Sequence, residues 1–250
     1  MDLSFPAFLA EEEATVMNAV FFEEDSESGQ QQSLRAGSGF LRRGDDCMAE
    51  EEFRGFREAC LQKKFSCHIH RRKGMPLVEM ITVSRLSDVV MVDPATSFHQ
   101  KDWPANDLAE NFLKRTECPV ILTPSSFSGL HKIVFICDGT ASSIAAIKQL
   151  VYLFPCFTDH PLEVIYSSAY VNNLAYKKEV AEWLNDHFSQ VSIKDTPSPG
   201  NMALQEACAH EPRILAVMGM QAQPKLLQGF YQGGGKAGKL PDIPVFMSRH

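Results

Sequence analysis

The sequence lacks the features of a membrane or secreted protein. It contains no run of about 18 consecutive apolar residues, which a membrane-spanning helix requires. Its first twenty residues carry Asp2 and an acidic run at residues 11–13, where a secretory signal would have a basic segment followed by an apolar one. With 44% hydrophobic and 22% charged residues, the composition is that of a folded globular chain. We therefore expect a soluble intracellular protein.

Paired cysteines are also absent. The seven cysteines are scattered and none forms a Cys-x-x-Cys pair, so we expect reduced thiols and a cytoplasmic location rather than a disulfide framework or a structural zinc site. Cys137 closes an apolar run and is predicted to be a buried core residue, not a reactive thiol. Strand alternation places His68 and His70 on one face and Cys67 on the other. Two histidines are too few for a metal site, and none is predicted.

A basic surface is missing too. Residues 1–125 hold 21 acidic and 14 basic side chains and residues 126–250 hold 10 of each, so the net charge of −7 comes from the first half. Proteins that bind the phosphate backbone of nucleic acid present clustered Lys and Arg. The nearest candidate, Arg71, Arg72 and Lys73, is better explained as a solvated strand end. We expect no nucleic-acid partner.

No catalytic constellation emerges from the sequence. The serines at 125, 126 and 128 have no positioned base, and a short polar linker explains them better. The run Gly233-Gly-Gly-Lys-Ala-Gly-Lys239 imitates a phosphate-binding P-loop, but Leu240 replaces the Ser or Thr that would bind magnesium, and Pro241 follows. We interpret this run as a flexible connection and expect binding and association rather than catalysis.

What the sequence does contain is an internal repeat. Residues 74–93 align without a gap on residues 200–219, at an offset of 126, and both read as a helix followed by a buried strand. The closing segments 118–122 and 243–247 correspond as well, because 26 residues separate Asp93 from Pro119 and 25 separate Gly219 from Pro244. The spacing predicts two tandem units, over residues 1–125 and 130–250.

The second unit shows its elements most clearly. Short apolar runs predict strands at 132–137, 162–167, 191–194, 214–218 and 245–247, and apolar residues at helical spacing predict helices at 144–154, 174–188 and 202–210. Strands that alternate with helices predict an α/β fold, with a mainly parallel, five-stranded, Rossmann-like sheet covered on both faces.

The first unit is predicted to be incomplete. Its strands at 16–22, 65–70 and 88–92 and its helices at 51–64 and 77–85 have counterparts in the second unit, but the counterpart of strand 132–137 would fall before Met1. That strand is central in a doubly wound sheet. We therefore expect either that the N-terminal segment replaces it or that the first sheet is rearranged. The polar stretch 24–46 predicts a long mobile loop.

These features together resemble the universal stress protein family, in its arrangement of two domains in one chain, over nearly the whole length. The resemblance is carried by KIVFIC running into Asp138, Gly139 and Thr140, by ILAVMG ending at Gly219, and by the closing segment from Pro244. It implies two tandem domains of the adenine nucleotide hydrolase-like type, often with an ATP or AMP site at the carboxyl ends of the first and fourth strands. An open α/β sheet places a ligand there on physical grounds as well.

The glycine pattern of nucleotide-binding members of this family is only partly matched. In them the fourth strand is followed by Gly, two residues, Gly, nine residues, Gly and Ser or Thr, and the glycines let main-chain N–H groups approach phosphate. Here Gly219 holds the first position, but Ala222 stands at the second and Gln232 at the third, with Gly233 and Gly234 beginning a glycine run one residue late.

The resemblance also implies roles for other residues. Asp138 would contact the base or ribose of the nucleotide, and Ala169 or Tyr170 would line the adenine pocket. In the first unit Asp93 takes the place of the first glycine, so we predict no nucleotide there. The competing interpretation of the second unit is structural: Asp138 caps the helix that follows it, and Gly219 lets a strand turn into a loop.

Three hypotheses therefore stay open. The leading one is a cytoplasmic, stress-protein-like binding or regulatory protein that holds adenine nucleotide in its second unit only. The second is a slow ATPase. The third is a nucleotide-free interaction scaffold with a protein partner or a second copy, in which the closing strands around Val120 and Val245 pair edge to edge. Such pairing would either fuse the two units into a pseudo-dimer or join separate chains.

Overall fold

The computed structural model describes residues 3–12, 16–23, 46–65, 67–73, 75–93, 107–167, 174–198, 200–220 and 242–249, and the structural statements below concern these ranges. The predicted mobile loop at 24–46, except its last residue, and the glycine run near residue 233 lie outside them. Among the described helices, none is long and apolar enough to cross a membrane.

The second half of the chain alternates strands and helices, as its sequence predicts. Its elements are β5 (Lys132–Cys137), α5 (Ala141–Leu153), the short 3₁₀ helix η1 (Pro155–Asp159), β6 (Leu162–Ser167), α6 (Leu174–His187), β7 (Val191–Thr196), α7 (Gly200–His210), β8 (Ile214–Gly219) and β9 (Val245–Ser248). The strands β5 and β6 coincide with their predicted ranges, because each is an apolar run ended by turn residues.

The first half contains the predicted strands and helices together with two further helices, α1 and α4. Its elements are α1 (Ser4–Glu12), β1 (Met17–Glu23), α2 (Asp46–Gln62), β2 (Cys67–Lys73), α3 (Pro76–Ser84), β3 (Val90–Val92), α4 (Asp107–Arg115) and β4 (Val120–Leu122). The sequence interpretation missed α4 and began α2 too late.

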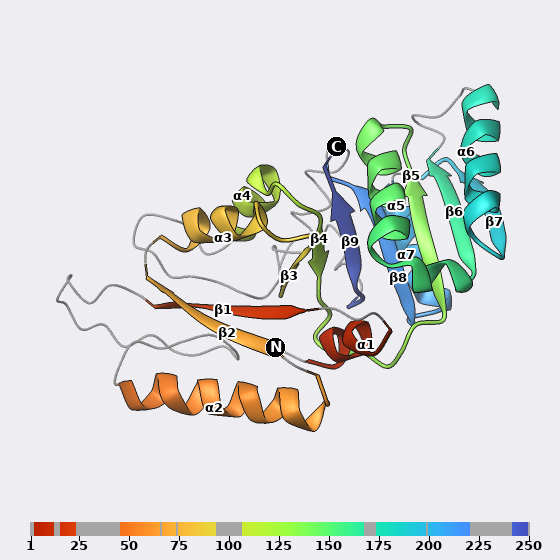
Figure 1. Ribbon diagram of the computed structural model, residues 1–250. Coiled ribbons are helices and arrows are strands. Elements are labelled where there is room, and N and C mark those ends of the chain that lie inside the picture. The colour runs from red at the N-terminus through yellow and green to blue at the C-terminus, as the bar shows by residue number, and fades with distance from the viewer. Residues whose placement is uncertain are drawn as a thin grey trace.

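One seven-stranded sheet runs through both halves, in the order β3-β4-β9-β8-β5-β6-β7 (Figure 1). All neighbouring strands in it are parallel except β4 and β9, which pair antiparallel with Val120 opposite Met247 and Leu122 opposite Val245. The closing strands therefore pair within the chain. Because each of them has a neighbour on both sides, pairing between separate chains through these two strands does not fit the fold.

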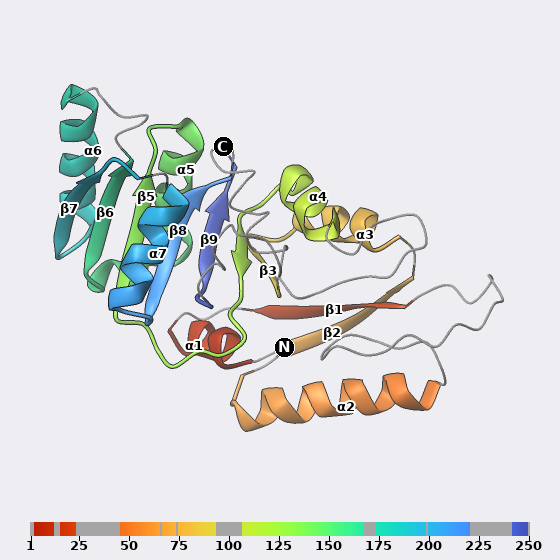
Figure 2. The same cartoon turned by 180° about the vertical axis from the view of Figure 1, so that it is seen from behind.

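Helices cover both faces of this sheet (Figures 1 and 2). Alternate residues of β5 enter opposite cores: Ile133 and Phe135 pack in the core with α1, α5 and α6, whereas Val134 and Ile136 pack in the core with α3, α4 and α7. Most of the central strand residues are fully buried. This two-sided burial explains why the strands appear in the sequence as continuous apolar runs.

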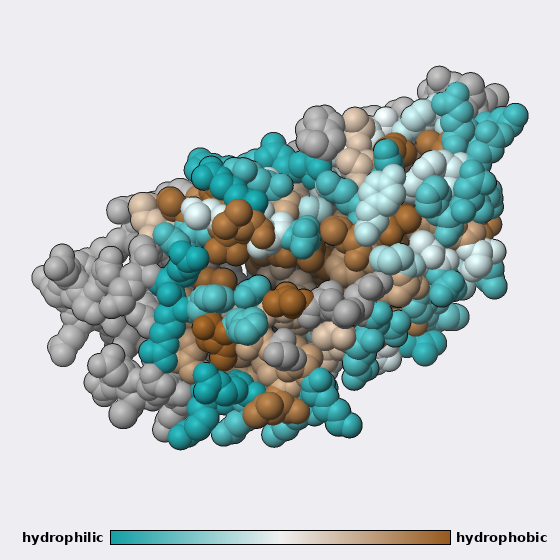
Figure 3. Space-filling model, in the orientation of Figure 1, coloured by the Kyte–Doolittle hydropathy of each residue, from teal (hydrophilic) through white to brown (hydrophobic). Residues whose placement is uncertain are grey.

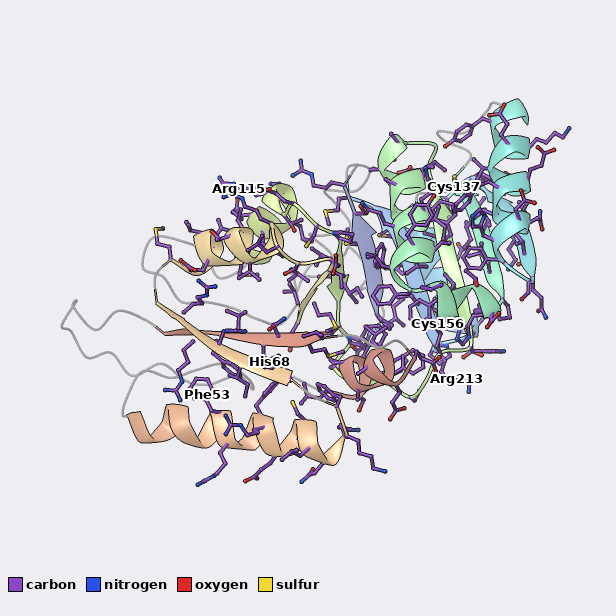
Figure 4. The ribbon with its side chains drawn as sticks, viewed as in Figure 1. Phe53, His68, Arg115, Cys137, Cys156 and Arg213 are labelled. Atoms are coloured by element: carbon purple, nitrogen blue, oxygen red, sulfur yellow. The ribbon has the colours of Figure 1, made fainter. Side chains whose placement is uncertain are left out.

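The strands β1 and β2 form a separate, two-stranded parallel sheet, the only other sheet of the described residues. The helix α2 covers one face of it: Phe21 of β1 packs against Phe53 and Phe56, with ring centroids 4.7 and 5.4 Å apart, and the Arg71 guanidinium lies 3.8 Å above the Phe53 ring (Figure 4). The expected first sheet is thus divided. Of the two outcomes left open by the sequence, the structure has the rearranged sheet.

The N-terminal helix α1 packs on the second half of the chain. The ring centroid of Phe5 lies 5.0 Å from that of Phe127, in the segment that joins β4 to β5. The ring centroid of Phe8 lies 6.2 Å from that of Phe157 in η1. In the same joining segment, the Ser125 N–H and hydroxyl donate to the Asp242 carboxylate. These contacts give the predicted serine-rich linker a structural role.

Candidate functional site

The candidate site lies where β5 and β8 end side by side. The two strands are parallel, with Phe135 opposite Val217, so that Asp138 and Gly219 come to the same edge of the sheet. From β5 the chain continues to β6 on one side, while β8 and β9 lie on the other. Such a reversal of strand order is where open α/β sheets bind their ligands. Figure 4 shows Cys137 at this end of β5 and Arg213 at the opposite end of the sheet.

A tight turn connects β5 to α5. Gly139 has a φ of 77°, a left-handed conformation that glycine adopts without steric cost. Behind it, the Thr140 N–H and hydroxyl both donate to Oδ1 of Asp138, at 3.0 and 2.7 Å. The Asp138 carboxylate is only 4% exposed. These two hydrogen bonds compensate part of the cost of burying it.

Thr140 is the N-cap of α5. Its Oγ1 accepts a hydrogen bond from the Ser143 N–H at 3.2 Å, and the Ser143 hydroxyl donates back to the Thr140 carbonyl oxygen at 2.9 Å. The cap uses one of the N–H groups at the helix start that have no partner within the helix. The sequence assigned the capping role to Asp138, whereas the structure gives it to Thr140, with Asp138 holding the cap in place.

Gly219 is in close contact with the first turn of α5. A Cβ atom at this position would lie 2.4 Å from Ser142 Oγ, 2.5 Å from Ser143 N and 2.7 Å from the Ser142 carbonyl carbon. Both serines are fully buried. Glycine is therefore required here by the approach of β8 to α5, which is a reason different from the strand-to-loop turn that the sequence suggested.

Side chains of α6 and β6 extend the site on its other side. The Tyr166 hydroxyl donates to the Lys177 carbonyl oxygen at 3.3 Å, and Lys177 Nζ lies 5.0 Å from the Tyr166 ring centroid while pairing with Asp195 of β7. Lys177 thereby brings a positive charge to the carboxyl ends of β6 and β7.

Buried groups near the turn are held in their neutral forms. Burial raises the pKa of the Cys137 thiol to about 12, and this side chain is fully buried, which agrees with its predicted role as a core residue. Tyr176 of α6 has its pKa raised to about 12, first by burial and then by the neighbouring Cys137 and Asp138. Tyr176 therefore keeps its hydroxyl proton throughout the neutral pH range.

The structure brings together four of the predicted site residues: Asp138, Gly139, Thr140 and Gly219. The other four, Ala169, Ala222, Gly233 and Gly234, lie outside the described residues, as does Tyr170.

The sequence interpretation missed Ser142, Ser143 and Tyr176. A signal for the first two is present, because Thr140 is followed three residues later by a polar residue at the start of an apolar helix, as in a capping pattern. Tyr176 has no such signal, since only the fold shows how α6 packs against β6 and β7.

Other sequence candidates stay apart from this site. His68 and His70 are both exposed and Cys67 is half-buried, as strand alternation predicts, and His70 Nε2 lies 3.0 Å from Asn18 Oδ1. Within the described ranges, no group of three or more His, Cys, Asp and Glu side chains could hold a metal ion.

Comparisons with known proteins identify the fold. No family model and no curated protein matches the sequence. A universal stress protein from Archaeoglobus fulgidus DSM 4304 has a similar structure, with a TM-score of 0.67 at 13% identity, covering 99% of this chain and 92% of that one. A Pseudomonas aeruginosa UCBPP-PA14 protein of the same family name has a TM-score of 0.54 at 12% identity, over 98% and 86% of the two chains. A protein of unknown function from Pseudomonas aeruginosa PAO1 has a TM-score of 0.52 at 12% identity, over 94% and 82%. The chain therefore has the fold of universal stress proteins.

Proposed function

We propose that this protein is a universal stress protein-like binding or regulatory protein, built of two tandem units, which binds adenine nucleotide at the carboxyl ends of β5 and β8. The observation that carries the proposal is the buried Asp138 carboxylate at the point where the strand order reverses, directly before the N-terminus of α5. The positive end of a helix and the edge of a parallel sheet favour a ligand with anionic and hydroxyl groups.

The described residues suit the ribose end of a nucleotide better than its phosphates. Asp138 can accept hydrogen bonds from hydroxyl groups, and Tyr176 and Lys177 add donor groups on the α6 side, Lys177 already being paired with Asp195. On the phosphate side, Gly219 is already packed on Ser142 and Ser143. The shifted glycine run that would supply further N–H groups lies outside the described residues.

A nucleotide-free scaffold is the second candidate function. It is favoured by the local completeness of the turn, because Thr140 caps α5 and Gly219 fits against the cap without any ligand. In that account the antiparallel β4–β9 pair fuses the tandem units into a pseudo-dimer, and protein partners bind to its surface. A slow ATPase would in addition need an oriented water and a magnesium site. No residue described here is assigned to either task.

The two candidates are separated by calorimetric titration of ATP, ADP and AMP, each with and without magnesium. We expect saturable binding of at least one of them to the full chain. The key variant is Asp138→Asn, which keeps the Oδ1 acceptor for Thr140 but removes the charge and replaces the second acceptor oxygen by an NH2 donor. We expect it to weaken binding about fivefold, because a hydrogen bond to a charged acceptor is worth about 1 kcal/mol more than a neutral one.

The matched control is Asp93→Asn, which makes the same change after β3, the tandem counterpart of β8. We expect nucleotide affinity to stay at the wild-type value in this control. No heat of binding for any nucleotide at millimolar concentration, with no rise in melting temperature, would leave the nucleotide-free scaffold as the function. Equal affinities of the wild type and Asp138→Asn would move the site away from β5.

A further inference from the structure

The end of α2 is fixed by a tight turn that leads directly into β2 (Figure 1). The Phe65 N–H donates to the Cys60 carbonyl oxygen at 3.2 Å, and the Lys64 N–H donates to the Leu61 carbonyl oxygen at 3.1 Å. Lys64 itself has a φ of 59°. Two such bonds around a left-handed residue form the Schellman motif, which ends a helix in one defined geometry. The turn therefore sets where β2 starts relative to the last turn of α2.

This geometry brings two cysteine side chains together. Because side chains alternate along a strand, Cys67 lies on the same face of β2 as Arg71, whose guanidinium lies over Phe53 of α2. Cys60, near the end of α2, is 4% exposed and belongs to the core cluster against which Cys67 packs. The two thiols share a hydrogen bond. The turn thus holds Cys60 and Cys67 in direct contact.

The other cysteine of α2 is too far away to compete for Cys67. Cys47 stands near the opposite end of the helix, thirteen residues before Cys60. An α-helix rises about 1.5 Å per residue, so about 20 Å of helix separates the two positions. Within one chain, Cys60 is therefore the thiol of α2 that Cys67 can reach.

The surroundings keep both thiols protonated at neutral pH. Burial, followed by the neighbouring Cys60, raises the pKa of Cys67 to about 11. Burial also raises the pKa of Cys60, although the hydrogen bond with Cys67 opposes this rise. A stabilised thiolate favours the reduced form of a thiol pair, and here burial outweighs any such stabilisation. The surroundings therefore do not disfavour a disulfide, but they make its formation slow, because the attacking species is the thiolate.

We propose that Cys60 and Cys67 form a reversible disulfide, with a small anionic disulfide as the oxidant. The entry point is Cys67, which is half-buried, whereas Cys60 is covered. The exposed Lys63 and Lys64 place positive charge beside the pair, and Figure 3 shows hydrophilic surface at this end of α2. In the oxidised form, the cross-link fixes the end of α2 to the start of β2. The connection between the two elements thereby responds to the redox state of its surroundings.

Two exchange steps produce the disulfide, written here for glutathione disulfide. The Cys67 thiolate attacks one sulfur of glutathione disulfide, which forms a mixed disulfide and releases one glutathione thiolate that takes up a proton. Cys60 then loses its proton to solvent and attacks the Cys67 sulfur, which releases the second glutathione as a thiol. The two protein thiols lose two electrons in total, and one glutathione disulfide is reduced to two glutathione thiols.

The test incubates the full chain in mixtures of reduced and oxidised glutathione, blocks the free thiols in denaturant and maps the disulfides by mass spectrometry after trypsin digestion. Trypsin cleaves after Lys63 and Lys64, which lie between the two cysteines, so peptides 58–63 and 65–71 stay joined only by the disulfide. We expect the joined peptides in oxidising mixtures and their separation by excess reduced glutathione. Formation should be roughly tenfold faster at pH 8 than at pH 7, because the thiolate fraction rises tenfold.

The matched pair of variants is Cys60→Ala and Cys118→Ala. Without Cys60, no neighbouring thiol resolves the mixed disulfide at Cys67, so we expect this adduct to accumulate to roughly ten times its wild-type level. Cys118 is half-buried like Cys67 but contacts Thr116 before β4. Cys118→Ala is therefore expected to form the Cys60–Cys67 disulfide at the wild-type rate. Equal circular dichroism of both variants shows that the fold is retained.

Three results would overturn the proposal: peptides that stay separate in every oxidising mixture, pairing of Cys67 with a cysteine other than Cys60, or a disulfide that lowers the melting temperature. We expect oxidation to raise the melting temperature by roughly 5 °C, because the cross-link restricts the unfolded chain. The inference does not depend on the nucleotide site, so disulfide formation in Asp138→Asn is expected to be unchanged. Failure of one proposal can thereby be told from failure of the other.

Discussion

Gly219→Ala tests whether the end of β8 rests on the first turn of α5. The added Cβ would meet three atoms at 2.4, 2.5 and 2.7 Å, and two of these, Ser143 N and the Ser142 carbonyl carbon, are backbone atoms that cannot rotate away. Overpacking of a core costs about 1–3 kcal/mol, and backbone contacts place this case near the upper limit. Alanine recovers about 0.5 kcal/mol by restricting the unfolded chain. The free energy of unfolding should fall by about 2–3 kcal/mol.

The measurement is urea denaturation at constant pH, accompanied by a thermal scan. For a chain of this size, the expected loss lowers the melting temperature by roughly 5–10 °C. The matched control is Gly55→Ala in α2, where a Cβ would have nothing within 4 Å. There the higher helix propensity of alanine should raise stability by about 0.5–1 kcal/mol. The same substitution thus has opposite effects at the two glycines.

A second variant shows which atoms cause the loss. Adding Ser142→Ala to Gly219→Ala removes the hydroxyl but leaves both backbone contacts, so less than half of the lost stability should return. Full recovery would mean that the contact is one side-chain clash and not the approach of β8 to the helix. A loss below about 0.5 kcal/mol in Gly219→Ala alone would refute the packing argument altogether.

Three further predictions concern polar groups. Thr140→Ala should lower the free energy of unfolding by about 2–3 kcal/mol, because the Ser143 N–H loses its cap and the buried Asp138 carboxylate loses the Thr140 hydroxyl, and Thr140→Ser should restore most of it in the same denaturation assay. Glu163→Gln should cost about 1–3 kcal/mol, since this carboxylate is 7% exposed and pairs with both Lys132 and Lys194. Burial raises the pKa of Glu163, but its bonds to the two lysines outweigh burial and hold the pKa below its ordinary value of 4.5. The stabilisation that goes with this lowered pKa is complete above pH 4.5 and is lost as the pH falls below it. In denaturation experiments at stepwise lower pH, the difference in free energy of unfolding between the wild type and Glu163→Gln should therefore shrink. A difference that stays constant with pH would contradict this prediction.

The second half of the fold could be predicted from the sequence because its information is local. The runs that form β5 and β6 are largely apolar, with Lys132 and Glu163 as exceptions, and end at turn residues, and a strand buried on both faces has this pattern. In the first half, α4 was missed. Leu108, Phe112 and Leu113 do recur at helical spacing, but α4 is only nine residues long, and so short a pattern is easily overlooked.

Strand pairing could be predicted only as alternatives. Val120 and Val245 are far apart in the sequence, and an apolar run shows that a strand exists without showing its neighbour. The sequence therefore left open whether the closing strands join within or between chains, and the fold has them within. The sequence likewise left open whether the first sheet is rearranged, but it did not indicate that β1 and β2 form a sheet of their own.

The candidate site was predicted in part for the same reason. Asp138 and Gly219 were identified through the resemblance to universal stress proteins, which rests on the two apolar runs that end at these residues. Their packing partners were not, because the contact between Gly219 and Ser143 depends on how β8 lies beside α5. The structure thus changed the reason for the glycine from backbone conformation to close packing.

The most direct test of the proposed nucleotide site is amide NMR of the full chain during titration with ATP and magnesium. The account predicts saturable shifts that begin at the amides of Gly139, Thr140 and Gly219, with the same residues unresponsive in Asp138→Asn at equal nucleotide concentration. Unchanged amides at these three residues, at nucleotide concentrations up to the millimolar range, would contradict the site at the ends of β5 and β8.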